Sequence, residues 1–227
     1  MESEADMVAD PWPAEAVVRA ATGPDHGRGM AQRVAEALCE VLPVDAVTLA
    51  LWTETPHRRM LYATNAAAQR LEELQFEVGE GPCVSAAAIG RPLMVDDLQG
   101  AVTPWPLFGP LARERLSTVG AIYAFPLVEG HAHLGTADML RFEAGPLGVE
   151  AEEAARLAVR AAALILLTAR ITPVLDAHWQ RTHVATGVMA ERLGITPAEA
   201  LARLRSTALG TGRPLPDLTE DVLSRHG

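Results

Sequence analysis

The run VGAIYAFPLV, residues 119–128, restricts the fold more than any other part of the chain, because it contains no charged side chain. Such a run predicts a strand at the centre of a sheet. Shorter patterns predict further strands at residues 44–52, 59–65, 92–98 and 132–142. Helices are predicted at residues 29–42, 66–75, 82–89, 105–117 and 149–171. This order predicts an α+β fold, in which an antiparallel sheet is covered by helices on at least one face.

Proline and glycine residues divide the end of the chain into three short amphipathic helices. Gly194 ends the first, and Thr196 with Glu199 predicts a capping box at the start of the second. A glycine-marked stop is predicted near Gly210, and the third helix is predicted to begin after Pro216. Three short helices bury little apolar surface by themselves. We therefore expect this segment to pack on its preceding helix or on a second chain.

These patterns divide the chain of 227 residues into three parts. Residues 1–27 are acidic and contain several prolines, which predicts a mobile leader with at most a short helix. Residues 28–172 are predicted to form the α+β domain with its connecting helix. Residues 173–227 are predicted to form a separate all-α domain.

Charge is distributed unevenly between these parts. The net charge of the chain is −10, but residues 173–227 contain six arginines and six acidic residues. The first 172 residues would therefore repel a polyanion, whereas the C-terminal part would tolerate one. The chain has two cysteines, no secretion signal and no apolar stretch long enough to cross a membrane. These features predict a cytoplasmic protein that does not contact a membrane.

Two groups of motifs resemble known families. The segment LQFEVGEGPCVSAAAIGRPLMVDDL (74–98), with WPLF (105–108) and AIYAFPL (121–127), resembles the GAF sensor domains of actinobacterial regulators. The segment ATGVMAERLGITPAEALARLRSTALGTGRPL (185–215) resembles the ANTAR domain attached to them, a three-helix RNA-binding module linked to transcription antitermination.

The resemblance implies a regulator in which the GAF domain senses a small molecule or another signal. The ANTAR domain, as part of a homodimer, would bind hairpin loops in nascent RNA. Affinity would come from neutralised phosphates and from guanidinium groups stacked on unpaired bases. Arg205 and Arg213 match basic positions of the ANTAR motif, and Arg181, His183 and Arg192 would extend the same surface.

A second interpretation assigns these helices to dimerisation or protein interaction without RNA. It is favoured by the zero net charge of residues 173–227 and by Thr186, at a position where the family often has a basic residue. Ala185 and Gly187 permit close approach of RNA or of a neighbouring helix, and tight packing inside the bundle explains both of them better.

Six residues around the glycine-rich loop are candidates for lining a sensor pocket, because ligand sites are mostly apolar with few polar groups. They are Phe76, Cys83, Val84, Trp105, Phe108 and Tyr123. Packing in an ordinary core explains these side chains almost as well.

No catalytic centre, metal ion or cofactor is predicted. Cys83 at the start of a short helix could be reactive, but free cysteine is commonly a small buried hydrophobe. A thiol-dependent enzyme would require Cys39 and Cys83 to lie close together beside an open pocket. His131 and His133 alternate on a predicted strand with Asp138 nearby, but exposed histidines at a hairpin are much commoner than metal ligands.

A homodimer is expected from the helix predicted at residues 149–171, whose apolar surface is wider than one sheet face requires. One stripe contains Ala151, Ala155, Ala158, Ala162, Ile165 and Thr168, and another contains Leu157, Leu164 and Leu167.

Overall fold

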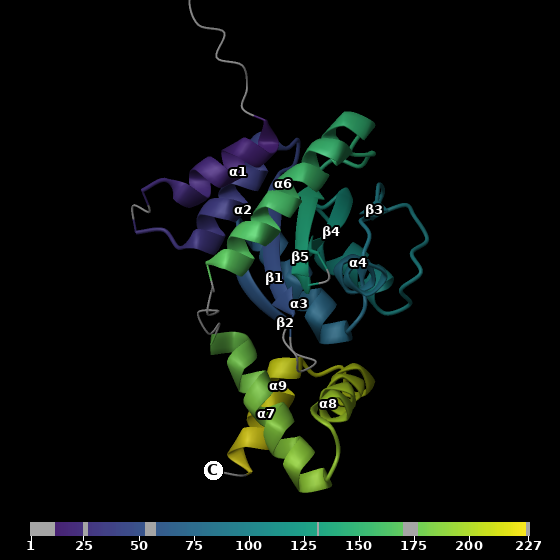
Figure 1. Cartoon of the computed structure of the whole chain (residues 1–227). Helices are drawn as coiled ribbons and strands as arrows, with labels where there is room; N and C mark the ends of the chain where they lie inside the picture. Colours follow the sequence, from purple (N-terminus) through teal and green to yellow (C-terminus); the bar gives the residue numbers. More distant parts are fainter. Residues whose placement is uncertain (1–11, 25–26, 53–57, 131, 170–176, 226–227) are drawn as a thin grey trace, which may run out of the picture.

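A computed structural model describes residues 12–24, 27–52, 58–130, 132–169 and 177–225 of the chain. Its centre is one antiparallel sheet of five strands in the order β2-β1-β5-β4-β3 (Figure 1). The strands are β1 (Ala46–Trp52), β2 (Arg58–Ala63), β3 (Leu93–Val95), β4 (Ala121–Glu129) and β5 (Ala132–Arg141). The predicted α+β class is confirmed, and the apolar run at residues 119–128 forms most of β4.

Helices lie on both sides of this sheet. On one face, α1 (Pro13–Thr22), α2 (Met30–Val41) and α6 (Val149–Thr168) share a core with Val47, Tyr123 and Met139 of the strands. On the other face, α3 (Ala66–Val78) and α5 (Phe108–Arg115) pack over Ala46, Ile122 and Leu140, and α4 (Pro82–Ile89) contacts β4 and β5. Successive strand residues point to opposite faces of a sheet, so each strand contributes to both cores.

Helix α1 lies within the segment that was predicted to be a mobile leader. It begins at Pro13, a residue favoured in the first turn of a helix, and it packs against α2 and α6. Its Val17 is fully buried, and Ala21 is 5% exposed. The sequence signal is weak because a helix of ten residues needs tertiary packing for stability, and a local pattern does not reveal that packing.

The chain ends in α7 (Ala177–Leu193), α8 (Pro197–Thr211) and α9 (Leu215–Ser224). The predicted capping box is confirmed: Thr196 Oγ1 accepts a hydrogen bond from the N–H of Glu199 at 3.2 Å, and the Glu199 carboxylate accepts one from the N–H of Thr196 at 2.8 Å. The helix stop lies two residues beyond the predicted Gly210, because Gly212, with φ of 65°, adopts the left-handed conformation that ends α8.

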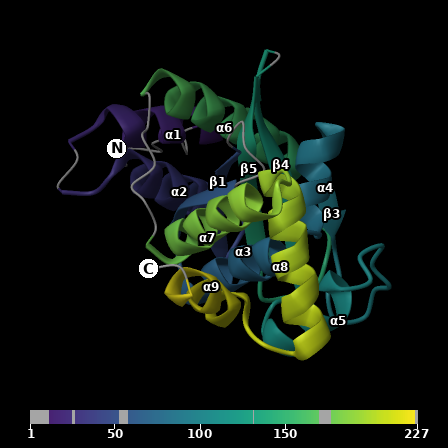
Figure 2. The same cartoon turned by 90° about the horizontal axis from the view of Figure 1, so that it is seen from below.

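The core of these three helices includes one residue from the α+β domain. Phe76 of α3 packs with six residues of the C-terminal helices, namely Trp179, Leu201, Leu204, Ala208, Leu215 and Leu218. Figure 2 looks toward this contact, with α7, α8 and α9 in front of α3. Among the described residues the helices therefore pack on α3, whereas the sequence analysis expected them to pack on the preceding helix or on a second chain.

Three predictions lie partly or wholly outside the described residues: part of the leader (1–11 and 25–26), the position of His131, and the end of the helix predicted at 149–171 (170–171). None of the described helices is both long and apolar enough to cross a membrane.

Gly135 in β5 is expected to tolerate no side chain, because a Cβ atom there would overlap the carbonyl oxygen of Ala50 in β1. We expect Gly135→Ala to lower the free energy of unfolding by about 1–3 kcal/mol, as overpacking does. The matched control is Gly187→Ala in α7, where a Cβ atom would meet nothing within 4 Å. Alanine there should stabilise the helix by up to about 1 kcal/mol. Urea unfolding followed by circular dichroism measures both, and a fully stable Gly135→Ala variant would contradict the observed pairing of β1 with β5.

Candidate functional site

The glycine-rich loop at residues 79–83 joins α3 to α4. Gly79 ends α3 with φ of 74°, a conformation that glycine adopts without strain. Gly81 has φ of 136°, and a Cβ atom on it would lie 2.8 Å from Oε1 of Gln75. Pro82 occupies the first turn of α4, where its missing N–H is not needed. The loop therefore specifies a tight turn that places Cys83 against α3.

Glu80 connects this loop to the segment that contains Trp105 and Phe108. Its Oε1 accepts hydrogen bonds from the backbone N–H groups of Leu107 and Phe108, the latter at 2.8 Å, at the start of α5. A carboxylate is favourable at the N-terminus of a helix. Trp105 Nε1 also donates to Ser85 Oγ of α4 at 2.9 Å. Two of the three segments that carry the GAF resemblance, 74–98 and 105–108, thus form one structural unit.

Behind the loop lie five polar side chains that we name the buried cluster: Arg58 (β2), Glu72 and Gln75 (α3), Cys83 (α4) and Asp138 (β5). Each of them is at most 5% exposed. Arg58 Nε donates to Glu72 Oε1 at 2.7 Å, and Arg58 Nη1 donates to Cys83 Sγ. Gln75 Nε2 donates to Asp138 Oδ2 at 2.7 Å, and Gln75 Oε1 accepts from the N–H of Cys83 at 2.8 Å. The cluster therefore links two strands to two helices.

Burial changes the protonation of this cluster. Burial, followed by the charge of Glu72, raises the pKa of Asp138 to about 7, although Arg58 and Gln75 act in the opposite direction. Burial also raises the pKa of the Cys83 thiol well above its ordinary value, against the effect of Arg58. Asp138, buried beside the charged Glu72, therefore keeps its proton to an unusually high pH.

Three members of the cluster are possible metal ligands. Glu72, Cys83 and Asp138 each offer one ligand atom, and these atoms lie within 4.8 Å of one another. The sequence grouped Asp138 with His131 and His133 instead. In the structure His133 is exposed, whereas Asp138 is fully buried, so the predicted grouping does not describe this site. No local pattern singles out Glu72, because its partners are distant in the sequence.

The end of α3 contacts the C-terminal helices directly beside the buried cluster. The ring of Phe76 packs edge to face against Trp179 and against His183, with 5.8 Å between the centroids of the latter pair. The guanidinium carbon of Arg205 lies 5.0 Å from the centroid of the Phe76 ring. Arg205 also lies against Gly79, where a Cβ atom would be 2.9 Å from Nη1. Glycine at position 79 therefore ends α3 and also leaves room for Arg205.

Arg205 is a half-buried cation. Burial, with a smaller effect from Arg58, lowers its pKa to about 10, so the group remains charged at neutral pH. Its Nε has no hydrogen-bond partner among the described residues. The position of Arg205 against the face of the Phe76 ring is a cation–π arrangement.

The other basic residues predicted to bind RNA differ in their surroundings. Arg181 forms an ion pair with Glu220, and Arg213 forms one with Asp221 at 2.7 Å. Arg192 is exposed, and His183 is half-buried against Phe76.

Ala185, Thr186 and Gly187 of α7 differ in their exposure to solvent. Ala185 is fully buried within the three-helix bundle, whereas Gly187 is exposed. Thr186 is also fully buried, and its hydroxyl donates to the carbonyl oxygen of Thr182 at 2.7 Å. Because Thr186 is buried, its uncharged side chain does not determine the charge of the outer surface of these helices.

The six residues predicted to line a sensor pocket are not gathered around one cavity. Phe76 lies in the contact with the C-terminal helices, and Cys83 lies in the buried cluster. Trp105 and Phe108 pack edge to face with ring centroids 5.7 Å apart. Val84 is half-buried on α4. Tyr123 faces the core on the other side of the sheet, so the sheet itself separates it from the others.

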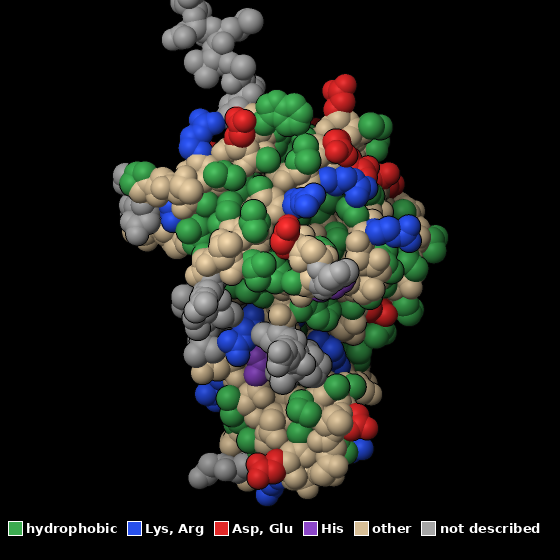
Figure 3. All heavy atoms as spheres, viewed as in Figure 1, with side chains coloured by type: hydrophobic (Ala, Val, Ile, Leu, Met, Phe, Trp, Pro, Cys, Tyr) green, Lys and Arg blue, Asp and Glu red, His purple; other side chains and the backbone are tan. Residues whose placement is uncertain are grey.

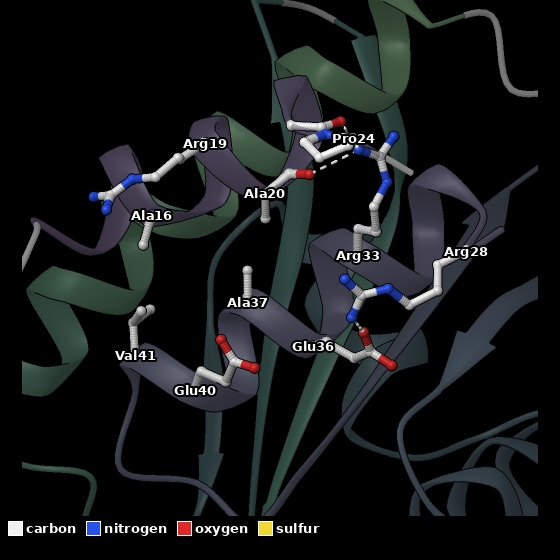
Figure 4. A pocket seen from close by; sticks show the side chains of 11 residues that line it. Ala16, Arg19, Ala20, Pro24, Arg28, Arg33, Glu36, Ala37, Glu40 and Val41 are labelled. Carbon is white, nitrogen blue, oxygen red and sulfur yellow. Dashed lines mark hydrogen bonds and ion pairs between the residues drawn. The ribbon is translucent and has the colours of Figure 1, made fainter. Parts of the chain in front are cut away.

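Several cavities are lined by described residues, and one of them is lined in part by Phe76. One of about 460 Å³ lies between α1 and α2 (Figure 4). Its Arg33 donates to the carbonyl oxygens of Ala20 and Gly23 at 2.9 and 2.7 Å, and Arg28 pairs with Glu36 at 3.0 Å. With Arg19 and Glu40, the lining contains three arginines and two glutamates.

Two further cavities lie beside α6 and α3. One of about 650 Å³ lies between Trp12, the end of α2 and the first half of α6. A smaller one of about 200 Å³ lies at the contact of α3 with the C-terminal helices. It is lined by Glu73, Phe76, Glu77, Trp179, Thr182, Pro214, Leu215 and Pro216.

The two thiols lie on opposite faces of the sheet. Cys39 packs with the core under α2 and α6, whereas Cys83 contacts Arg58 on the side of α3 and α4. Both cysteines are free. The close pair of thiols that a thiol-dependent enzyme would require is therefore not formed.

The pKa of Asp138 predicts a pH-dependent stability. The folded state keeps a proton that the unfolded state loses between about pH 4 and 7, so the unfolding free energy should fall as pH rises through this range, by at most about 1.4 kcal/mol per pH unit. Asp138→Asn removes this titration and keeps an acceptor for Gln75. Urea unfolding at a series of pH values, with a chelator present, should show the variant gaining stability relative to the parent protein as pH rises. Parallel profiles would contradict the assignment.

Comparisons with known proteins address the fold around this site. Residues 28–166 match the family model of the GAF domain. No curated protein matches the chain. A similar solved structure is the GAF domain of a phosphoenolpyruvate-protein phosphotransferase from Coxiella burnetii, with 17% identity, a TM-score of 0.57, and coverage of 70% of this chain and 92% of that chain. The corresponding GAF domain from Acinetobacter has 10% identity, a TM-score of 0.50, and coverage of 72% and 95%. At these identities the likeness concerns the fold alone. Because the family model matches more than half of its residues, the chain belongs to the GAF domain family.

Proposed function

We propose that this protein is a cytoplasmic, non-enzymatic regulator whose GAF domain senses a small molecule or another signal. Its C-terminal helices would act as an ANTAR domain that binds hairpin loops in nascent RNA and promotes transcription antitermination. The observation that carries the proposal is the contact of Arg205 and Phe76, because it joins the expected RNA-binding part directly to the sensor domain.

The packing of the C-terminal helices supports this coupling. Their core includes Phe76, which is 4% exposed, so separation from α3 would expose an aromatic ring and the apolar residues around it. A signal that moved α3 would therefore change how firmly the helices are bound. The cavity of about 200 Å³ beside Phe76 is one place where a ligand would have this effect.

Electrostatics support a conformation in which RNA binding is withheld. Arg205 is covered by α3, and the acidic GAF domain lies beside it. Separation would return Arg205 to solvent, where Arg192 and Arg203 are already exposed. Phosphate neutralisation by such residues supplies most non-specific affinity for nucleic acid.

A second function is favoured by a different observation. The ion pairs Arg181–Glu220 and Arg213–Asp221 occupy two of the expected RNA-binding residues within the helices themselves. Under this alternative, the C-terminal helices bind another protein or a second chain and do not bind RNA.

We also propose that the protein is not a thiol-dependent enzyme. Cys83 is fully buried and its pKa is raised by burial, which disfavours the thiolate that acts as a nucleophile.

A homodimer formed through α6 is also part of the proposal. Of the two predicted stripes, the one with Ala155, Ala158 and Ala162 is buried within the chain's own core. The other leaves Leu164 and Leu167 49% and 43% exposed, three residues apart on one side of the helix. Figure 3 shows hydrophobic side chains gathered over the face formed by α2 and α6.

Phe76→Ala should weaken the contact and increase RNA binding. We expect about a tenfold or greater gain in affinity for a library of paired RNA hairpins with randomised loops, a typical size for coupling between two sites. The gain should be salt-dependent, and it should be lost when Arg205→Ala and Arg213→Ala are added. Gel-shift titration measures each variant, and Phe142→Ala, at an exposed phenylalanine of the GAF domain, is the matched control.

If none of these variants shifts the hairpins even at low salt, RNA binding is contradicted and the protein-interaction alternative is favoured. If Phe76→Ala and the parent protein bind equally well, RNA binding stands but control by the α3 contact does not.

Leu164→Glu should convert dimers into monomers, because it places a charge in the exposed stripe of α6. Sedimentation velocity measures the mass of the parent protein and the variant. Val149→Glu, at an 87% exposed position in the first turn of the same helix, should leave the dimer intact. An unchanged dimer mass for Leu164→Glu would show that this stripe is not the interface.

A further inference from the structure

The buried cluster, together with Thr48 on the adjacent strand β1, contains oxygen atoms that lack partners among the described residues. Glu72 Oε2, Asp138 Oδ1 and Thr48 Oγ1 are buried and accept no hydrogen bond from any described residue. Thr48 on β1 is directly opposite Asp138 on β5, so both side chains point to the same face of the sheet. Each unsatisfied buried polar atom costs about 1–3 kcal/mol. Unpaired oxygens on Glu72 and Asp138, two members of the same cluster, indicate that a further partner belongs there.

The spacing of the side chains suits a metal ion. The ligand atoms of Glu72, Cys83 and Asp138 lie within 4.8 Å of one another. In a tetrahedral zinc site with bonds of about 2.0–2.3 Å, ligand atoms are separated by about 3.5 Å. Small rotations of the two carboxylates would therefore be sufficient to bind an ion between them and the sulfur.

The summed charge of the three ligands and Arg58 indicates that the ion is divalent. With both carboxylates and the thiolate ionised, the three ligands carry three negative charges, and Arg58 offsets one of them. A divalent cation offsets the other two, which leaves the fully buried group neutral. An ion of charge one or three would leave a net charge in a site that water does not reach, and this is strongly unfavourable.

The donor atoms narrow the choice further. A thiolate with two carboxylates suits Zn²⁺, which accepts sulfur and oxygen ligands in a four-coordinate site. Mg²⁺ and Ca²⁺ prefer oxygen alone and six or more ligands. The fourth position in this site would be filled by water or by the hydroxyl of Thr48, which lies on the same face of the sheet.

Arg58 is compatible with a bound ion because it uses different atoms. It donates to Oε1 of Glu72 and leaves Oε2 free. Its Nη1 donates to the sulfur of Cys83. Hydrogen bonds of this kind from outside the ligand shell orient metal ligands and stabilise a thiolate.

We propose that Glu72, Cys83 and Asp138 form a structural binding site for one divalent transition-metal ion, with Zn²⁺ as the favoured ion and Arg58 as its outer hydrogen-bond donor. The bound ion joins α3, α4 and β5 beneath the contact with the C-terminal helices. The site does not depend on the proposed RNA function, since it lies wholly within the GAF domain.

The test uses Co²⁺ as a spectroscopic probe in the full-length Cys39→Ser variant. This variant leaves Cys83 as the single thiol of the chain, so any cobalt–thiolate charge-transfer absorption must come from Cys83. Co²⁺ is added to the folded protein and, separately, is present during refolding from urea, so that slow access to a buried site does not conceal binding. We expect a charge-transfer band that saturates at one Co²⁺ per chain and that disappears when Zn²⁺ is added. Binding by surface histidines gives no such band.

Asp138→Asn in the same background tests the carboxylate ligand. It should weaken Zn²⁺ binding about tenfold or more, measured by competition with a coloured chelator. Glu143→Gln, at an exposed acidic residue, should leave the affinity unchanged. Absence of the cobalt–thiolate band under both conditions would overturn the proposal and assign the unpaired oxygens to protons or water. Equal affinity of Asp138→Asn and its parent would exclude the ligand set proposed here.

Discussion

The guanidinium of Arg58 fixes the positions of α3 and α4 relative to the sheet. It projects from the edge strand β2, yet it is 5% exposed, and it contacts the carboxylate and backbone carbonyl of Glu72 as well as Cys83. Removing one partner of a buried ion pair costs about 3–5 kcal/mol, because the other charge is left buried alone. The turn formed by Gly79 to Cys83 depends on this arrangement, since it is packed directly against Gln75 of the same cluster.

Helix α3 contributes to two parts of the molecule, the buried cluster and the core of the C-terminal helices. Gln75 belongs to the buried cluster and donates to Asp138, whereas the next residue, Phe76, enters the core of the C-terminal helices. A change in the cluster that shifts α3 must therefore also shift Phe76 and the ring against which Arg205 lies. This gives a physical route from the interior of the GAF domain to the C-terminal helices. It also explains why the GEGPC loop needs both of its glycines, one beside Arg205 and one beside Gln75.

Local patterns were sufficient for most helices and strands, because β4 is a continuous apolar run and α8 begins with a capping box. They allowed a short helix in the leader, but they did not indicate that α1 packs against α6. The buried cluster could not be predicted, because Gln75 and Asp138 are 63 positions apart and Arg58 and Cys83 are 25 apart. The sequence analysis considered both Cys83 and Asp138, but it placed them in two separate sites. Cys83 was considered as a reactive thiol, and Asp138 as a metal ligand beside two histidines. Arg205 was assigned to an open surface, since nothing in its own helix shows that α3 covers it.

Hydrogen exchange tests the central claim, that α3 couples the buried cluster to the C-terminal helices, most directly. Glu72→Gln weakens the hold of Arg58 on α3 and does not touch the C-terminal helices. Mass spectrometry of the full chain should show faster amide exchange in α3 and also in α7 and α8, with α6 unchanged as an internal reference. Faster exchange in α3 with no change in α7 and α8 would show that the two parts are not coupled, and would contradict the account.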